Sequence, residues 1–308
     1  MEKDSKIYVA GHNGMAGAAI FNQLKCRGYN NIVVSSHKEL DLENQEAVFS
    51  FFQREQPEYV FFAAGLVGGV GYKQSHPLDM LNKNLHMIMN VLDASYYYHV
   101  KKILNIGSIL LYPESENGIS ENEIGKIDLD GTDAPYTLAK LTGEKLCEYY
   151  KEQYGLQTVT LVPCNFFGEN SPFGTDKAGV IPSLIERFHL AKARKTEEVV
   201  IWGTGKACRE FLYVQDLADA CLFVMQLSGE GSVLNVGTGN EISIYDAAMV
   251  IKDVVGYTGR VVFDASKPEG RKHMVLDSKR LYDLGWKNIT GFERAIHNTY
   301  QWYMENIA

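Results

Sequence analysis

The sequence predicts an α/β protein: a Rossmann-type, doubly wound parallel sheet joined to a smaller, mixed α/β substrate domain. Two features indicate this fold. Short apolar runs of strand-forming residues alternate with longer helix-like segments through the first half of the chain. A glycine-rich turn joins the first of these runs to the first helix-like segment, which is how a doubly wound sheet usually begins.

The strands of the predicted sheet follow one another through the first half of the chain. We expect them at residues 6–10, 31–36, 58–64, 102–107 and 157–162. We expect helices at residues 18–24, at 77–99, and over a segment that contains Tyr136 and Lys140 and ends near Gln153. The glycine-rich residues 65–71 are expected to form a loop. Strands joined by helical crossovers of this kind pair in parallel.

Beyond about Asn165 the alternation loosens, and glycine-punctuated loops separate shorter elements. We expect helices at residues 180–192, 215–227, 243–255 and 291–305, and short strands at 199–202 and 261–263. We therefore divide the chain into a dinucleotide-binding Rossmann domain, residues 1–165, and a substrate domain, residues 166–308. Some segments can cross between the two.

Composition narrows the functional classes. With 308 residues the chain can bury a sizeable core, and its net charge of -8 at pH 7 argues against nucleic acid as a main partner. No apolar stretch approaches membrane-spanning length, and the charged first residues do not resemble a signal peptide. The five cysteines are scattered, which suits a reducing compartment and provides no metal-ligand spacing. We expect a cytoplasmic protein with no metal, no nucleic-acid partner and no membrane partner.

Three glycines in the first turn, Gly11, Gly14 and Gly17, are spaced i, i+3 and i+6 between the first strand and the first helix. Glycine permits a tight turn and a close approach of the backbone, and the amino end of the helix then faces a pyrophosphate. We expect this loop, with Asn13 and Met15, to bind a dinucleotide. The alternative is a glycine-rich turn that binds no ligand.

The second strand ends without the acidic residue that would bind a ribose 2′-hydroxyl and favour NAD. Ser36, His37 and Lys38 follow instead, and hydroxyl and cationic groups suit a 2′-phosphate. This favours NADPH, without excluding NADH; the alternative is that Lys38 is only a solvated surface charge. The other residues expected to contact the cofactor are Asp41, Leu42, Ala63 and Ala64.

Tyr136 and Lys140 stand four residues apart, so on a helix they share one face. We expect the Lys140 ammonium to favour the phenolate and to lower the pKa of Tyr136 below its usual value of about 10. Ser108 follows the fourth strand, at the sheet edge where ligands bind. We expect Ser108 to donate a hydrogen bond to a substrate carbonyl oxygen, Tyr136 to protonate that oxygen, and Lys140 to hold the nicotinamide ribose. The alternative for Ser108, if it is considered without Tyr136 and Lys140, is that it only caps a turn after the strand.

The chain resembles the extended short-chain dehydrogenase/reductases over its full length, and more narrowly the GDP-L-fucose synthase branch of that family. The matching stretches are residues 10–17, 67–69, 112–113, 135–140, 180–182, 187–189, 202–205, 209–212, 235–239 and 259–268. The resemblance implies a GDP-4-keto sugar as substrate, bound by residues 166–308. It also implies a homodimer, in which the long helix before His99 and the helix of Tyr136 pack against the partner.

The resemblance also assigns residues to the sugar nucleotide. It implies Arg187 and Arg209 near the diphosphate, where a guanidinium suits phosphate oxygens, and Trp202 near the nucleotide. Asn165, just after the fifth strand, is implied as a substrate contact. The other expected contacts are Val180, Lys267 and Arg271, with Lys272 or His273 as alternatives to Arg271. The alternatives are surface ion pairs for the arginines and a packed core ring for Trp202.

The chain departs from the family at the residues that the resemblance links to epimerisation. The family has a Cys two residues after the catalytic Ser and a His just before residues 180–182, and here these positions are Leu110 and Gly179. Neither side chain can carry a proton. The family's cofactor-binding arginines are also replaced, by Asn13 and His37.

We therefore predict an NADPH-dependent C4 ketoreductase of a GDP-4-keto sugar that lacks C3/C5 epimerase activity. The substrate is predicted to be a 4-keto-heptose or a 4-keto-6-deoxyhexose, and the resemblance indicates the reductases of bacterial capsule heptose pathways. One alternative is a complete epimerase/reductase in which Cys164 or His189 carries the protons. Another is a dehydrogenase or 4-epimerase, and a third is a dinucleotide-binding protein without turnover.

Overall fold

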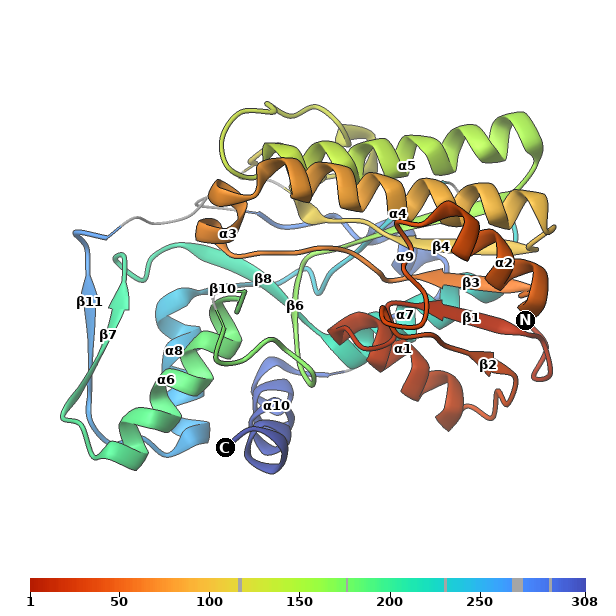
Figure 1. The fold of residues 1–308 in the computed structure, drawn as a ribbon. Helices are drawn as coiled ribbons and strands as arrows, with labels where there is room; N and C mark the ends of the chain where they lie inside the picture. The colour runs from red at the N-terminus through yellow and green to blue at the C-terminus, as the bar shows by residue number, and fades with distance from the viewer. Residues whose placement is uncertain (116–117, 176, 230–231, 268–273, 288–289) are drawn as a thin grey trace.

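The computed structural model describes residues 1–115, 118–175, 177–229, 232–267, 274–287 and 290–308. Its central layer is a six-stranded parallel sheet in the order β2-β1-β3-β4-β5-β9 (Figure 1). The strands are β1 Ile7–Ala10, β2 Ile32–Val33, β3 Tyr59–Phe62, β4 Lys102–Ile106, β5 Gln157–Pro163 and β9 Val233–Val236. This arrangement confirms the predicted fold class.

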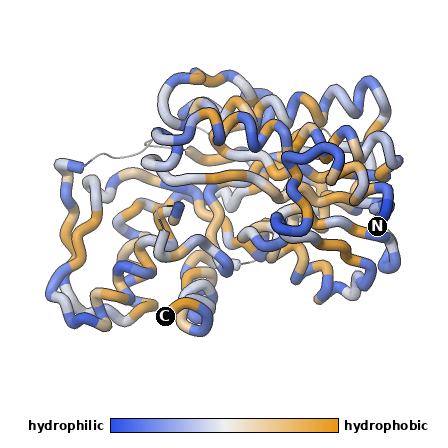
Figure 2. The backbone as a smooth tube through the Cα atoms, viewed as in Figure 1, coloured by the Kyte–Doolittle hydropathy of each residue, from blue (hydrophilic) through white to orange (hydrophobic). Residues whose placement is uncertain are grey.

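Helices cover both faces of this sheet. The helices of one face are α1 Met15–Cys26 and α7 Val214–Gln226, and those of the other are α2 Gln45–Glu55, α4 Pro77–Tyr97 and α5 Ala134–Tyr154. Along β1, Ile7 and Val9 belong to the core on the α1 side, while Tyr8 and Ala10 belong to the core on the α2 side. Side chains of a strand alternate between the two faces, so a strand buried on both must be apolar throughout. Hydrophobic and hydrophilic residues alternate along the covering helices, as expected for helices with one buried face (Figure 2).

The chain reverses direction across the sheet between β1 and β3. From β1 it passes outward to β2, and it then returns to form β3 on the other side of β1. In such a sheet the carboxyl ends of the two strands that flank the reversal border a crevice, where ligands bind. Gly11 follows β1, and Ala63 and Ala64 follow β3, so all three lie at this crevice.

The smaller elements lie at one end of the large sheet (Figure 1). They include a three-stranded sheet, β10 Glu241–Ser243, β8 Cys208–Tyr213 and β6 Asn165–Phe167, and a two-stranded sheet, β11 Arg260–Asp264 and β7 Glu198–Trp202. The helices packed with them are α6 Val180–Arg194, α8 Ile244–Val255 and α10 Phe292–Asn306. The remaining short helices are α3 Val70–Ser75, α9 Lys279–Asp283 and the 3₁₀ turns η1 Ile109–Leu111 and η2 Glu121–Glu123.

Several elements differ from those expected. The strand expected at residues 31–36 pairs only over Ile32–Val33, and the loop expected at 65–71 already contains the start of α3. Helix α2 was not expected, although Asn44 accepts a hydrogen bond from the Ala47 amide at 3.0 Å and caps it. The strands that were not expected are β6, β8, β9 and β10.

Residues beyond 165 contribute α7 and β9 to the large sheet and its helical layer. These two segments therefore cross the division at residue 165, which itself stays a prediction. Among the residues described, none of the helices combines the length and apolar content needed to cross a bilayer. Within the same part of the chain, no cluster of His, Cys, Asp or Glu side chains is placed to hold a metal ion.

Candidate active site

The glycine loop packs closely against the ends of two strands. Gly11 has a φ of +84°, and a Cβ there would lie 2.7 Å from backbone atoms of Ala64. A Cβ on Gly17 would lie 2.1 Å from the Gly11 carbonyl oxygen. Gly14 precedes α1 and provides no side-chain cap, so the first amides of that helix have no side-chain partner there. These amides and the cradle formed by Gly11 and Gly17 fit a pyrophosphate, because only a backbone without Cβ atoms leaves this approach open.

The segment after β2 holds its predicted cofactor residues in a turn. The Ser36 amide and hydroxyl both donate to the Glu39 carboxylate, at 2.9 and 2.8 Å. These bonds hold the pKa of Glu39 below its usual value. His37 and Lys38 are exposed, and the His37 Nδ1 lies 3.8 Å from the Asp41 carboxylate. No acidic residue ends this strand in the sequence, but the turn places the Glu39 carboxylate against Ser36. Leu42, the next predicted contact, is buried in the core beside α2.

Ser108, Tyr136 and Lys140, which we call the Ser–Tyr–Lys group, meet at the carboxyl end of β4. Ser108 follows β4 and also caps η1, because its hydroxyl accepts from the Leu110 amide at 3.3 Å. Tyr136 is only 7% exposed and forms a hydrogen bond with Ser108. Lys140 donates to the Ile106 carbonyl oxygen, the last of β4, at 2.8 Å.

The pKa values in this group differ from expectation. Burial raises the pKa of Tyr136 to about 12, although its hydrogen bond with Ser108 opposes the shift. Burial lowers the pKa of Lys140 to about 8. The prediction that Lys140 lowers the pKa of Tyr136 is wrong for this structure, because desolvation of the phenol outweighs any nearby cation. Tyr136 is therefore a protonated phenol, which is the form that donates a proton.

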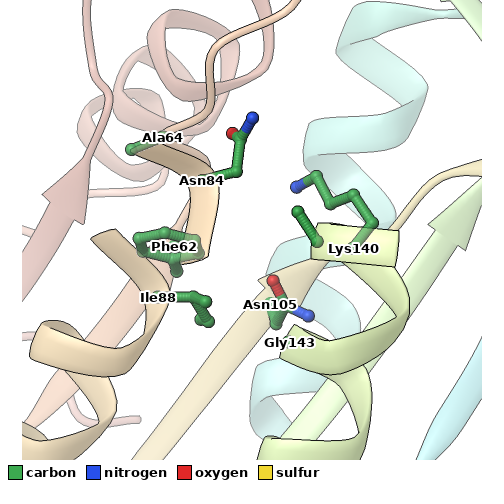
Figure 3. Close-up of a pocket in the computed structure, with 8 residues that line it drawn as sticks. Phe62, Ala64, Asn84, Ile88, Asn105, Lys140 and Gly143 are labelled. Atoms are coloured by element: carbon green, nitrogen blue, oxygen red, sulfur yellow. The ribbon is translucent and has the colours of Figure 1, made fainter. Parts of the chain in front are cut away.

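A small cavity lies between α4, α5 and the strands β3 and β4 (Figure 3). Lys140 extends from α5 and Asn84 from α4, and both polar ends are near the same side of this cavity (Figure 3). Asn84 is buried; it accepts from the Leu66 amide at 2.8 Å and donates to the Leu66 carbonyl at 3.0 Å. It thereby fixes the chain that follows Ala64. Asn84 was not predicted from the sequence, although Met80 and Ile88, four residues to each side, give its helical face an apolar pattern that Asn84 interrupts.

A second polar pair lies beside Tyr136. Lys73 of α3 makes an ion pair with Asp133, at 2.6 Å between Nζ and Oδ1, just before α5. The same Nζ lies 5.7 Å from the centroid of the Tyr136 ring. The neighbouring Tyr72 is covered by Lys177, whose Nζ lies 5.3 Å from its ring centroid. Lys73, Asp133, Tyr72 and Lys177 were not singled out from the sequence, because their contacts join segments far apart in the chain.

The predicted substrate residues fall into two groups. Asn165 of β6 donates to the Glu210 carbonyl at 3.5 Å, and Arg209 lies on the adjacent strand β8. The other group surrounds β7: Arg187 donates to the Val200 carbonyl at 2.8 Å, and Trp202 is 63% exposed with the Lys267 Nζ 5.9 Å from its ring. An exposed Trp202 is not the packed core ring considered as its alternative. Val180 is the exposed first residue of α6, and the prediction for Arg271 lies, like Lys272 and His273, outside the described residues.

Glu210 is a buried residue that was not predicted from the sequence. Its carboxylate accepts from the backbone amides of Thr238 at 2.5 Å, Gly239 at 2.7 Å and Leu276 at 2.9 Å. Burial nevertheless raises its pKa, and these bonds oppose the shift. Glu210 therefore ties the turn after β9 to β8, next to Arg209. The sequence feature that could have indicated Glu210 is its position directly after Arg209, a predicted substrate contact.

Cys164 and His189, the alternative proton carriers, have other surroundings. Cys164 is only 2% exposed, and burial, reinforced by the Glu210 carboxylate, raises the pKa of its thiol well above the usual value. The His189 Nδ1 lies 3.1 Å from the Tyr300 hydroxyl of α10, and its ring packs edge-on against Tyr303. A protonated thiol and an imidazole among aromatic rings are poorly suited to abstracting a proton from a sugar.

Comparison with known proteins places the chain among relatives of matching length. The family model described as the NAD dependent epimerase/dehydratase family matches residues 7–237. GDP-L-fucose synthase of Escherichia coli K12 is 40% identical, covering 98% of this chain and 97% of that protein. A GDP-6-OMe-4-keto-L-xylo-heptose reductase from Campylobacter jejuni has a TM-score of 0.92 and 34% identity, over 99% of both chains. A GDP-mannoheptose C4 reductase from Campylobacter jejuni, solved with NADP bound, has a TM-score of 0.90 and 36% identity, again over 99% of both chains.

Proposed function

The chain belongs to the NAD dependent epimerase/dehydratase family, and on that premise we propose that it is an NADPH-dependent C4 ketoreductase of a GDP-4-keto sugar. Within the family it is an extended short-chain dehydrogenase/reductase of the GDP-L-fucose synthase type, an oxidoreductase that acts on nucleotide sugars. The observation that carries the proposal is the convergence of the Ser–Tyr–Lys group at the end of β4. The glycine cradle lies at the end of β1, two strands away in the same sheet.

Each residue of the proposed site has its own role in the reduction of a ketone. NADPH, when bound, supplies the hydride. Ser108 would donate a hydrogen bond to the C4 oxygen, and the buried, protonated Tyr136 would give its proton to that oxygen. Lys140 would hold the nicotinamide ribose, and its contact with Ile106 already directs it to the end of β4. The cradle of Gly11 and Gly17 and the first amides of α1 would bind the pyrophosphate, with Asn13, Met15 and the turn at Ser36 to Asp41 around the adenosine.

Reduction without epimerisation is the finer part of the proposal. Epimerisation at C3 and C5 needs groups that remove and return protons. Leu110 and Gly179 stand where the family resemblance implies such groups, and neither can titrate. The buried thiol of Cys164 and the aromatic surroundings of His189 support the same conclusion.

The substrate proposed is a GDP-linked sugar. The exposed ring of Trp202, with Lys267 beside it, suits a nucleotide base and its phosphates, and the forked guanidinium groups of Arg187 and Arg209 suit the diphosphate. A 4-keto-heptose is the favoured sugar, because two similar solved proteins are reductases of GDP-heptoses; a 4-keto-6-deoxyhexose is the second candidate. The product would then serve the synthesis of a surface polysaccharide such as a capsule.

A homodimer is proposed through α4 and α5, which lie side by side (Figure 1). Leu78 and Met89 of α4 are 65% and 43% exposed, and Leu138 and Tyr149 of α5 are 37% and 56% exposed. Each pair is separated by about three helical turns, so its members share one face. Sedimentation of the wild type should show a dimer, and Met89→Glu with Tyr149→Glu should shift it to the monomer. A wild-type monomer at micromolar concentration would contradict the proposal.

The function is tested by mixing the protein with NADPH and an enzymatically made GDP-4-keto-heptose in D₂O. Nicotinamide absorbance reports reduction, and NMR of the product reports deuterium at C3 and C5. We expect NADPH oxidation without deuterium at either carbon, and no oxidation by Tyr136→Phe, which should still bind NADPH. Deuterium at C3 or C5 would return the chain to the epimerase/reductases, and NADPH binding without turnover on any GDP-keto sugar would make it a binding protein.

A further inference from the structure

Helix α3 brings a second lysine to the proposed proton donor. The glycine-rich chain after β3 leads into α3, and Lys73 of this helix is largely buried, with 14% of its side chain exposed. Its Nζ pairs with the Asp133 carboxylate at 2.6 Å and lies 5.7 Å from the centroid of the Tyr136 ring. A buried ammonium at this distance from a phenol is close enough to influence its ionisation.

The charged and polar groups around Tyr136 come from three elements. Ser108, after β4, forms a hydrogen bond with the phenol, and Lys140 lies one helical turn further along α5. Asp133 lies one turn before Tyr136, and its negative charge raises the pKa of the phenol. Lys140 is engaged with the Ile106 carbonyl, whereas Lys73 makes its ion pair with the carboxylate that opposes proton release.

We propose that Lys73 is a positioning residue: through its ion pair with Asp133 it keeps the Tyr136 phenol able to release its proton to the substrate. This inference rests on the reductase function proposed above. When Tyr136 gives up its proton, negative charge develops on the phenol oxygen. An unpaired Asp133 carboxylate would repel that charge, whereas a carboxylate paired with Lys73 repels it less.

A cycle of substitutions separates this electrostatic role from a simple clamp on α3. Lys73→Met should lower kcat about tenfold, the equivalent of about one pKa unit at Tyr136, and leave the KM for the GDP-sugar and the Kd for NADPH within about twofold. Lys73→Arg keeps the charge and should retain most of the activity. Asp133→Asn combined with Lys73→Met removes both charges and should recover most of the loss. Lys145→Met is the matched control, because Lys145 is also on α5 but pairs with Glu148 at 2.6 Å and with Glu144 at 3.5 Å.

The kcat of the double variant distinguishes the electrostatic role of Lys73 from a purely structural one. A mere clamp would be broken in both variants, so a double variant as slow as Lys73→Met would overturn the proposal, as would a Lys73→Met enzyme with full kcat. Melting temperatures of all variants check folding, and Lys73→Gln replaces Lys73→Met if the latter does not fold.

A second readout needs no substrate and so does not depend on the reductase function. In protein labelled at the tyrosine ζ-carbon, with the Tyr136 signal assigned by Tyr136→Phe, the pH at which that signal begins to move reports ionisation of the phenol. Lys73→Met should move it upward by about one pH unit, and the double variant should return it toward the wild-type value. If the wild type reduces no GDP-keto sugar but this shift appears, the proposed function fails and the role of Lys73 stands. An unchanged titration in Lys73→Met would overturn that role.

Discussion

Alanine at Gly17 should disrupt the glycine cradle, whereas alanine at Gly14 should not. The Cβ of an alanine at position 17 would lie 2.1 Å from the Gly11 carbonyl oxygen, 2.6 Å from its carbonyl carbon and 2.9 Å from the His12 amide nitrogen. These are backbone atoms, so no side-chain rotation can relieve the overlap, and the loop must move. At position 14 the nearest atom would be at 3.4 Å, and its φ of -82° suits any residue.

The two substitutions should therefore differ in how much they destabilise the fold. Gly17 lies in α1, where alanine would gain about 1 kcal/mol in helix propensity. Overpacking against rigid neighbours costs about 1–3 kcal/mol, and an overlap with backbone belongs at the upper end of this range. We expect a net destabilisation of about 2 kcal/mol for Gly17→Ala. For Gly14→Ala, which loses only a favourable N-cap residue, we expect less than about 1 kcal/mol.

Calorimetric titration with NADPH and urea denaturation measure both effects. Because the displaced loop is the proposed pyrophosphate cradle, Gly17→Ala should also weaken NADPH binding by at least about tenfold, or 1.4 kcal/mol. Gly14→Ala should keep a urea midpoint close to that of the wild type, because the nearest protein atom would lie 3.4 Å from its Cβ. A folded Gly17→Ala protein with wild-type NADPH affinity would refute the assignment of this loop to the cofactor.

Three further substitutions test other parts of the site. Burial lowers the pKa of Lys140 from 10.5 to about 8, so between these pH values the unfolded chain binds more protons than the folded chain, and the stability of the wild type should rise with pH. Lys140→Met should abolish turnover, increase stability below pH 8 and remove this rise of stability with pH. If the melting temperatures of the wild type and Lys140→Met change in parallel with pH, the burial argument is contradicted. Glu210→Gln should lower the free energy of unfolding by about 2 kcal/mol, because the new NH₂ group of the glutamine would face a backbone N–H. An unchanged urea midpoint would contradict this prediction. Trp202→Ala should weaken GDP binding about tenfold if its exposed ring stacks on the base, and equal affinity by calorimetry would exclude that contact.

The parts of the site that could be predicted from sequence depend on residues that are close in the chain. The glycines at positions 11, 14 and 17 lie between a strand and a helix, and close packing at two of them follows from that setting. Tyr136 and Lys140 share a face because a helix repeats every 3.6 residues. Ser108 directly follows a buried strand, so its place at the carboxyl edge of the sheet required only that the strands be parallel.

Strands in the second half were harder to predict because their burial comes from partners far along the chain. Strand β9, with only four residues, pairs with β5 and completes the large sheet, although some seventy residues separate the two. A four-residue apolar segment has no periodicity that distinguishes it from a loop or a helix turn. Strand β9 pairs where it does because one edge of β5 is not used by β4 and can accept another strand.

The sequence by itself determined the fold class, the glycine turn and the order of the proposed reactive groups, because these depend on local spacing. Only the tertiary structure decided which other groups lie near these residues: Asn84 bonded to Leu66, Glu39 bonded to Ser36, and Lys73 near the Tyr136 ring. It also decided the direction of the Tyr136 pKa shift. Helical spacing places a lysine near the phenol, but desolvation depends on how the whole chain packs around it, and here desolvation is the larger effect.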